Sequence, residues 1–119
     1  MEIKIPEINA DSGLEICDGN EEIYLRSLRL YVSNIPASLE KMKNVSKETL
    51  HDYSISAHGV KSISQYIGAE KAVKTAKQLE SMAKNGDLDG ILAANETFIQ
   101  YAWNLVNNIR SWLEKNGVA

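Results

Sequence analysis

Apolar residues recur every three or four positions along almost the whole chain, which is typical of amphipathic helices rather than strands. Asn20, followed by two glutamates, is a good N-cap for a long helix over 21–43. Pro36 lies inside this stretch, so a kink or a break is expected near residues 33–36. The apolar stripe of this helix is Tyr24, Leu28, Tyr31, Ile35, Leu39 and Met42.

A second long helix is predicted between Ser46, which would cap it, and Gly68, which would end it in a left-handed conformation. Its inward positions follow a 3-4-3-4-3 spacing. They are Leu50, Tyr53, Ala57, Val60, Ser64 and Ile67.

Two more helices are predicted over 70–84 and 88–115, where Asn85, Gly86 and Asp87 end the first and cap the second. The inward residues of the first are Ala72, Ala76, Leu79 and Ala83. Those of the second are Leu92, Phe98 or Ile99, Ala102, Leu105, Ile109 and Trp112.

A short helix over 10–17, capped by Asn9, precedes these four. Long amphipathic helices joined by short turns predict an all-α fold, an antiparallel up-and-down four-helix bundle with a short extra N-terminal helix. No repeat or linker-like segment divides the chain, so residues 1–119 are expected to form a single domain. No heptad seam remains once the bundle closes, and a monomer is expected.

The amino-acid composition mainly excludes classes of function. The 119 residues carry 13 Lys and Arg against 16 Asp and Glu, which gives a net charge of −3 and no basic footprint for nucleic acid. The single cysteine, Cys17, excludes an internal disulfide and a cysteine-based zinc site, and we expect it to be buried near the end of the bundle. Neither a signal peptide nor a run of about 20 apolar residues is present, so we expect a cytoplasmic protein without direct membrane insertion.

Only two histidines, His51 and His58, are available for histidine chemistry. At 100° per residue, His58 lies roughly 120° from the centre of the core stripe, and His51 lies roughly 140–180° away. The same outer face carries Ile55, Gly59 and Ser62 instead of the usual charged residues. A mid-helix glycine costs about 1 kcal/mol relative to alanine, which fits a surface kept low for a partner. We therefore interpret this face as a docking surface.

The spacing of the histidines argues against a metal site. His51 and His58 are two turns apart, about 10.5 Å by helical rise, whereas helical metal ligands are three or four residues apart. We interpret His51 as a surface residue, because Ser54 rather than a lysine stands three positions after it. Lys61 does stand three positions after His58, close enough to neutralise negative charge on the ring. No nucleophilic triad or glycine-rich phosphate loop is found.

The sequence around His58 resembles the motif of histidine-containing phosphotransfer (HPt) domains. That motif has an apolar residue two positions after the histidine, a lysine three after, a small residue four after and Gly-Ala ten and eleven after. Here these are Val60, Lys61, Ser62, Gly68 and Ala69. The segment 13–22 is also similar to the family, as are residues 78–80 and the turn at 85–87, and the resemblance covers about residues 7–115.

The resemblance implies a phosphoryl carrier without cofactor or metal of its own, and not a self-sufficient enzyme. His58 would accept a phosphoryl group from an aspartyl phosphate on a response-regulator receiver domain, including one in a hybrid sensor histidine kinase, and pass it to another receiver. Lys61 would balance the phosphoryl charge, and Glu80, 22 positions after the histidine, would orient the imidazole. The receiver would supply Mg²⁺ and most catalytic groups. We accordingly expect an exposed His58 with Glu80 beside one ring nitrogen.

One residue departs from the family pattern. Many members have glycine where this chain has Ser62, and serine is small enough to preserve access. Lys74, Lys77 and Lys84 are interpreted either as extra positive charge beside the site or as a solvated face. The alternative function is a helical adaptor with an HPt-like fold that binds signalling partners without phosphotransfer.

Overall fold

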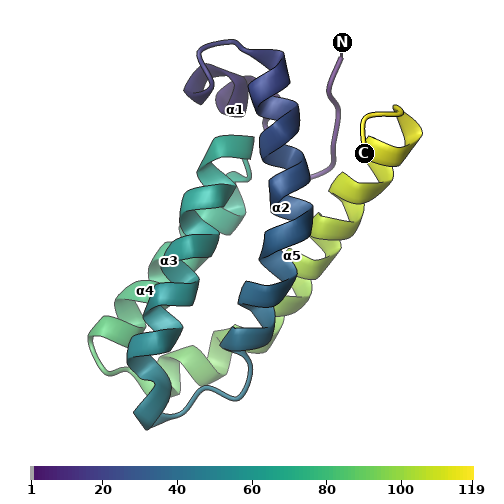
Figure 1. Ribbon diagram of the computed structural model, residues 1–119. Coiled ribbons are helices and arrows are strands. Elements are labelled where there is room, and N and C mark those ends of the chain that lie inside the picture. The colour runs from purple at the N-terminus through teal and green to yellow at the C-terminus, as the bar shows by residue number, and fades with distance from the viewer. Residues whose placement is uncertain (1) are drawn as a thin grey trace.

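The computed structural model describes residues 2–119, which form α-helices, one 3₁₀ turn and no strand within that range (Figure 1). This confirms the all-α prediction and most of its boundaries. The helices are α1 Ala10–Ile16, α2 Glu21–Met42, α3 Leu50–Ile67, α4 Glu70–Lys84 and α5 Leu88–Lys115.

The four long helices run alternately up and down and pack in a closed ring (Figure 1). Helix α2 contacts α3 and α5, and α4 also contacts α3 and α5. Every predicted inward residue of α2 and α4 is buried, and so is every one in α3 except Leu50, which is partly buried. The apolar stripes therefore meet in one core along the bundle axis.

The predicted caps form except the one at Ser46. Asn9, Asn20 and Asp87 each accept a hydrogen bond from a backbone N–H in the first turn of the helix that follows. Gly68 ends α3 with φ of 78°, the left-handed conformation that glycine adopts without steric cost. Ser46 begins a 3₁₀ turn over Lys47–Thr49 rather than capping α3 directly.

The short helix α1 covers the end of α3. The Asn9 N–H donates to the Gly68 carbonyl at 2.9 Å, and the buried Tyr24 hydroxyl donates to the Ile67 carbonyl at 2.7 Å. A side chain at Gly13 would collide with the Tyr24 ring and the Ile67 carbonyl, so this close approach requires glycine. The interaction fixes the end of the helix that carries His58.

A break at Pro36 does not occur, because α2 is continuous from Glu21 to Met42. Proline lacks the N–H that would bond the carbonyl four residues earlier, which disfavours it inside a helix. Its neighbours Ile35 and Leu39 are both fully buried. Their packing against the core holds the helix together across the missing bond.

The predicted core position of Leu92 is wrong, because its side chain is 57% exposed and Ile91 is fully buried instead. The core stripe continues through Asn95, a polar residue that a search for apolar spacing passes over. Its amide donates to the Met42 carbonyl at 2.9 Å and accepts from the Tyr53 hydroxyl at 2.7 Å. These bonds satisfy the buried amide, and they fix which face of α5 turns toward the core.

Candidate functional site

The site centres on a contact between α3 and α4. The His58 side chain lies on the outer face of α3 and is 58% exposed, whereas the Glu80 side chain on α4 is only 7% exposed. His58 Nδ1 lies 2.9 Å from Glu80 Oε2. The expected contact is therefore confirmed.

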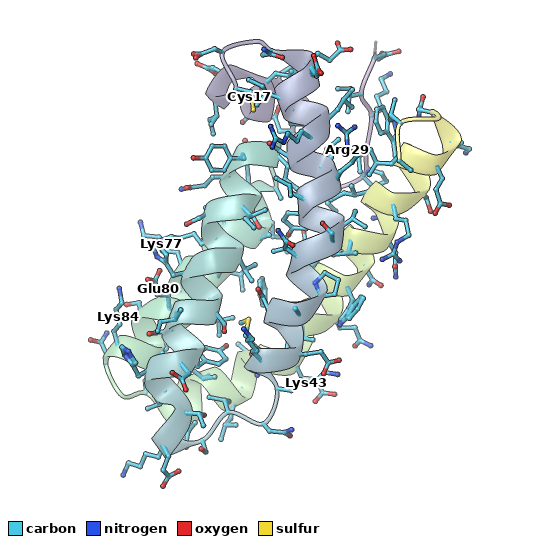
Figure 2. All side chains as sticks on the ribbon, viewed as in Figure 1. Cys17, Arg29, Lys43, Lys77, Glu80 and Lys84 are labelled. Atoms are coloured by element: carbon cyan, nitrogen blue, oxygen red, sulfur yellow. The ribbon has the colours of Figure 1, made fainter. Side chains whose placement is uncertain are left out.

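Two lysines hold the same carboxylate. Lys61, on α3, donates to Glu80 Oε1 at 2.9 Å and is largely covered by neighbouring atoms. Lys84, one turn after Glu80 on α4, lies 3.0 Å from Oε2. Figure 2 shows Glu80 and Lys84 with Lys77 along the same edge of the bundle. The amino group of Lys61 thus contacts Glu80 in this structure, and its role toward a phosphoryl group stays a prediction.

The surroundings of Glu80 keep it ionised. Burial by itself would raise the pKa of this carboxyl, but hydrogen bonds from Lys61, Lys84 and His58 outweigh burial and lower the pKa to about 2. The buried charge is thereby compensated at both oxygens.

The ionised carboxylate decides which ring nitrogen of His58 carries the proton. A carboxylate can only accept hydrogen bonds, so Nδ1 must donate to Glu80 Oε2. In the neutral ring Nε2 then keeps a free lone pair. Nε2 has no hydrogen-bond partner within residues 2–119. The arrangement presents one oriented nucleophilic nitrogen to solvent.

The predicted docking residues surround His58 on α3. Ile55 is 58% exposed, and a Cβ added at Gly59 would meet no atom within 4 Å. Ser62 is partly buried. A hollow of about 380 Å³ opens beside Ile55 at the junction of α2 and α3, and it is lined by Lys41, Thr49, Asp52, Tyr53, Ile55 and Ser56.

His51 provides a contrast on the same helix. It is exposed, as predicted, and within residues 2–119 its ring makes no hydrogen bond, whereas its backbone carbonyl accepts from Ser54 Oγ at 2.7 Å. No carboxylate of the described residues contacts its ring. The structure therefore separates two histidines that share one helix and similar exposure.

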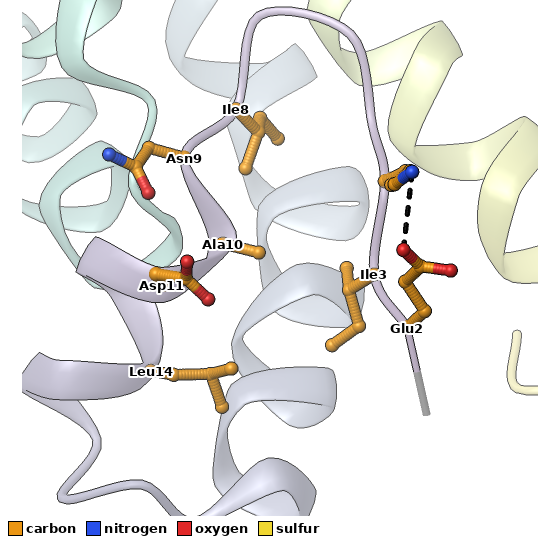
Figure 3. Close-up of a pocket in the computed structure, with 8 residues that line it drawn as sticks. Glu2, Ile3, Ile8, Asn9, Ala10, Asp11 and Leu14 are labelled. Atoms are coloured by element: carbon orange, nitrogen blue, oxygen red, sulfur yellow. Dashed lines mark ion pairs between the residues drawn. The ribbon is translucent and has the colours of Figure 1, made fainter.

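Sequence reasoning missed the role of Lys84, which it left open between added charge and a solvated face. The Glu80-to-Lys84 spacing of four residues on one helix is the signal that could have found the ion pair. It also missed a hollow of about 630 Å³ between the N-terminal segment and α1, lined by Ile3, Ile8, Leu14 and neighbours (Figure 3). No residue of α3 or α4 lines that hollow, so it is separate from His58.

Within residues 2–119, no group of three His, Cys, Asp or Glu side chains is arranged to hold a metal ion. In the same range, no helix is both long and apolar enough to cross a bilayer. No family model, curated protein or solved structure matches this chain.

Proposed function

We propose that this protein is a histidine-containing phosphotransfer domain that carries a phosphoryl group on His58. The observation that carries the proposal is the exposed imidazole whose Nδ1 is held by a buried, ionised carboxylate. Such an orientation leaves Nε2 as the nucleophile, which is what phosphoryl acceptance by a histidine requires. The resemblance of the His58 motif to the HPt family supports the same reaction.

The transfer of the phosphoryl group to His58 needs no reactant besides the two proteins and the Mg²⁺ of the receiver. The Nε2 lone pair attacks the phosphorus of an aspartyl phosphate on a receiver domain, a P–N bond forms, and the P–O bond to the aspartate breaks. The aspartate leaves as a carboxylate. The proton stays on Nδ1, and the positive charge that the ring gains lies against Glu80 at 2.9 Å.

The same contact serves the return step. When the phosphoryl group moves to another receiver aspartate, the bonding electrons return to Nε2. Because Nδ1 still carries its proton, the leaving group is neutral imidazole rather than the much more basic imidazolate. Glu80 therefore assists acceptance and donation alike, as a carrier needs.

The partner in this proposal is a response-regulator receiver domain, which supplies Mg²⁺ and the acidic residues that bind it. It would dock over the α3 surface formed by Ile55, Gly59 and Ser62. Here the exposed isoleucine offers apolar contact and the small residues let the receiver approach Nε2. Lys61 and Lys84, which pair with Glu80 beside His58, would add positive charge to the surface that the phosphoryl dianion approaches.

Phosphotransfer from a labelled receiver tests the proposal. A panel of receiver domains is phosphorylated with ³²P in the presence of Mg²⁺ and mixed with the wild-type chain, the His58→Gln variant and the His51→Gln variant. Acid-labile label should appear on the wild type and on His51→Gln, and should be absent from His58→Gln. His51→Gln is a close control because it removes the other exposed imidazole of α3.

Label on His58→Gln, or its loss from His51→Gln, would refute the assignment of His58. Absence of label from every receiver in the panel would overturn the carrier proposal. Binding of a receiver to the unlabelled wild type, measured by calorimetry, would then favour the adaptor function.

A further inference from the structure

We infer that Lys84 is a positioning residue for His58, acting through Glu80. The inference deepens the proposed function and rests on it for its link to phosphotransfer. Its direct consequence, the tautomer of an imidazole ring, is measurable without any receiver. It concerns a lysine that the motif around His58 does not contain.

The argument begins with the oxygen that Lys84 contacts. Lys84 Nζ lies 3.0 Å from Glu80 Oε2, and the same oxygen accepts from His58 Nδ1 at 2.9 Å. Lys61 instead bonds the other oxygen, Oε1, at 2.9 Å. Lys61 thus fixes one end of the carboxylate, and Lys84 fixes the end that faces the ring.

Without Lys84, the carboxylate would keep one fixed oxygen and one that only the imidazole holds. Rotation about the terminal bond of the glutamate side chain is broad and poorly restrained by its own torsional preference. Oε2 would then spend less time on the Nδ1 proton, and the ring would more often adopt the tautomer with the proton on Nε2. That tautomer has no lone pair at the reacting nitrogen.

Lys77 provides a matched control on α4. It lies three residues before Glu80, is exposed like Lys84, and follows the same edge of the helix (Figure 2). Across residues 2–119, Lys77 has no ion pair, whereas Lys84 pairs with Glu80. A general effect of removing one positive charge should therefore appear whether Lys77 or Lys84 is replaced. An effect that acts through Glu80 Oε2 should appear only when Lys84 is replaced.

Nitrogen-15 NMR of the unphosphorylated protein tests the inference. Two-bond proton–nitrogen correlations report which ring nitrogen is protonated, and His51 serves as an internal reference for an unheld ring. The wild type should show His58 mainly as the Nδ1–H tautomer. In Lys84→Met the ratio of Nδ1–H to Nε2–H should fall about two- to fivefold, the factor expected for one partly exposed ion pair. Lys84→Arg and Lys77→Met should keep the wild-type ratio.

An unchanged ratio in Lys84→Met, or an equal fall in Lys77→Met, would overturn the inference whether or not phosphotransfer occurs. The initial labelling rate by a receiver should fall by a similar factor in Lys84→Met and recover in Lys84→Arg. If the ratio falls as expected but no receiver labels the wild type, the carrier proposal fails while the positioning of the ring by Lys84 stands. Circular dichroism shows whether each variant is folded.

Discussion

Among the polar contacts that bridge helices in this bundle, the clusters around Asn95 and Glu80 differ in whether they leave an atom free for a ligand. Asn95 on α5 joins Tyr53 on α3 and the carbonyl of Met42 at the end of α2, all three buried. Glu80 on α4 joins an imidazole and two ammonium groups, with the imidazole exposed to solvent. The first cluster is neutral and enclosed, whereas the second is charged and opens to one side.

The difference indicates what each cluster does. A neutral buried network whose groups are satisfied within the protein specifies how helices pack and has no remaining capacity for a ligand. A buried carboxylate that orients an exposed base leaves one atom, Nε2 of His58, free to react. The Asn95 cluster is enclosed in the fold, and the proposed function assigns the Glu80 cluster to phosphotransfer. Substitutions can separate these two roles.

Asn95→Ala should have the largest effect on stability. The variant leaves the Tyr53 hydroxyl and the Met42 carbonyl without their partner in the core, and each unmade buried bond costs about 1–3 kcal/mol. The free energy of unfolding, measured with urea, should therefore fall by at least the cost of one such bond, about 1–3 kcal/mol. Asn104→Ala, which removes an exposed amide from the same helix, is the control.

The labelling rate of folded Asn95→Ala should match that of the wild type. A variant as stable as the wild type would show that the enclosed cluster does not hold the bundle together. A folded variant that is labelled much more slowly would show that the two clusters are coupled.

The sequence was sufficient to predict the helices because several of their boundaries are determined locally. Asn9, Asn20, Gly68 and Asp87 act through their own turn of backbone, and the predicted ranges of α4 and α5 agree with the structure. Whether a helix continues past a proline depends on tertiary packing instead. The continuity of α2 through Pro36 relies on its buried neighbours, which propensity alone does not describe.

From the residue pattern alone, the site could be predicted only where spacing along one helix determines it. The outer position of His58 follows from the helical period, and its contact with Glu80 came from the family resemblance, because the two residues are on different helices. The ion pair of Lys61 with Glu80 requires the packing of α3 on α4, which no local pattern gives. The buried position of Asn95 was missed for a different reason. A polar residue at a core position interrupts the apolar stripe of its helix in the sequence.

The acid dependence of stability should distinguish the charged cluster from the neutral one. The native pKa of Glu80 is lowered to about 2 from an ordinary value near 4.5. Between these values the unfolded chain binds a proton that the native protein does not, so stability falls as pH falls. The stabilisation from this ionisation is complete above about pH 5 and is lost as pH approaches 2.

Urea unfolding of the wild type and Glu80→Gln between pH 2 and 6 measures this effect. The stability advantage of the wild type should narrow steadily below pH 5, because the variant lacks the titrating carboxyl while other groups cancel in the difference. Glu96→Gln corrects for the loss of one exposed carboxylate elsewhere on the surface. A constant difference across this range would mean that the ion pairs of Glu80 do not stabilise the native state.

Gly59→Ala should have the smallest effect on stability, and in the opposite direction. Alanine in mid-helix is favoured over glycine by about 0.5–1 kcal/mol, and the new Cβ would meet no atom within 4 Å. The free energy of unfolding should therefore rise by about that amount. If a receiver packs closely over α3, the added methyl group should also slow labelling of the adjacent His58. If the variant is more stable and is labelled as fast as the wild type, Gly59 is not part of the docking surface. That result would not bear on the contact between Glu80 and the His58 ring.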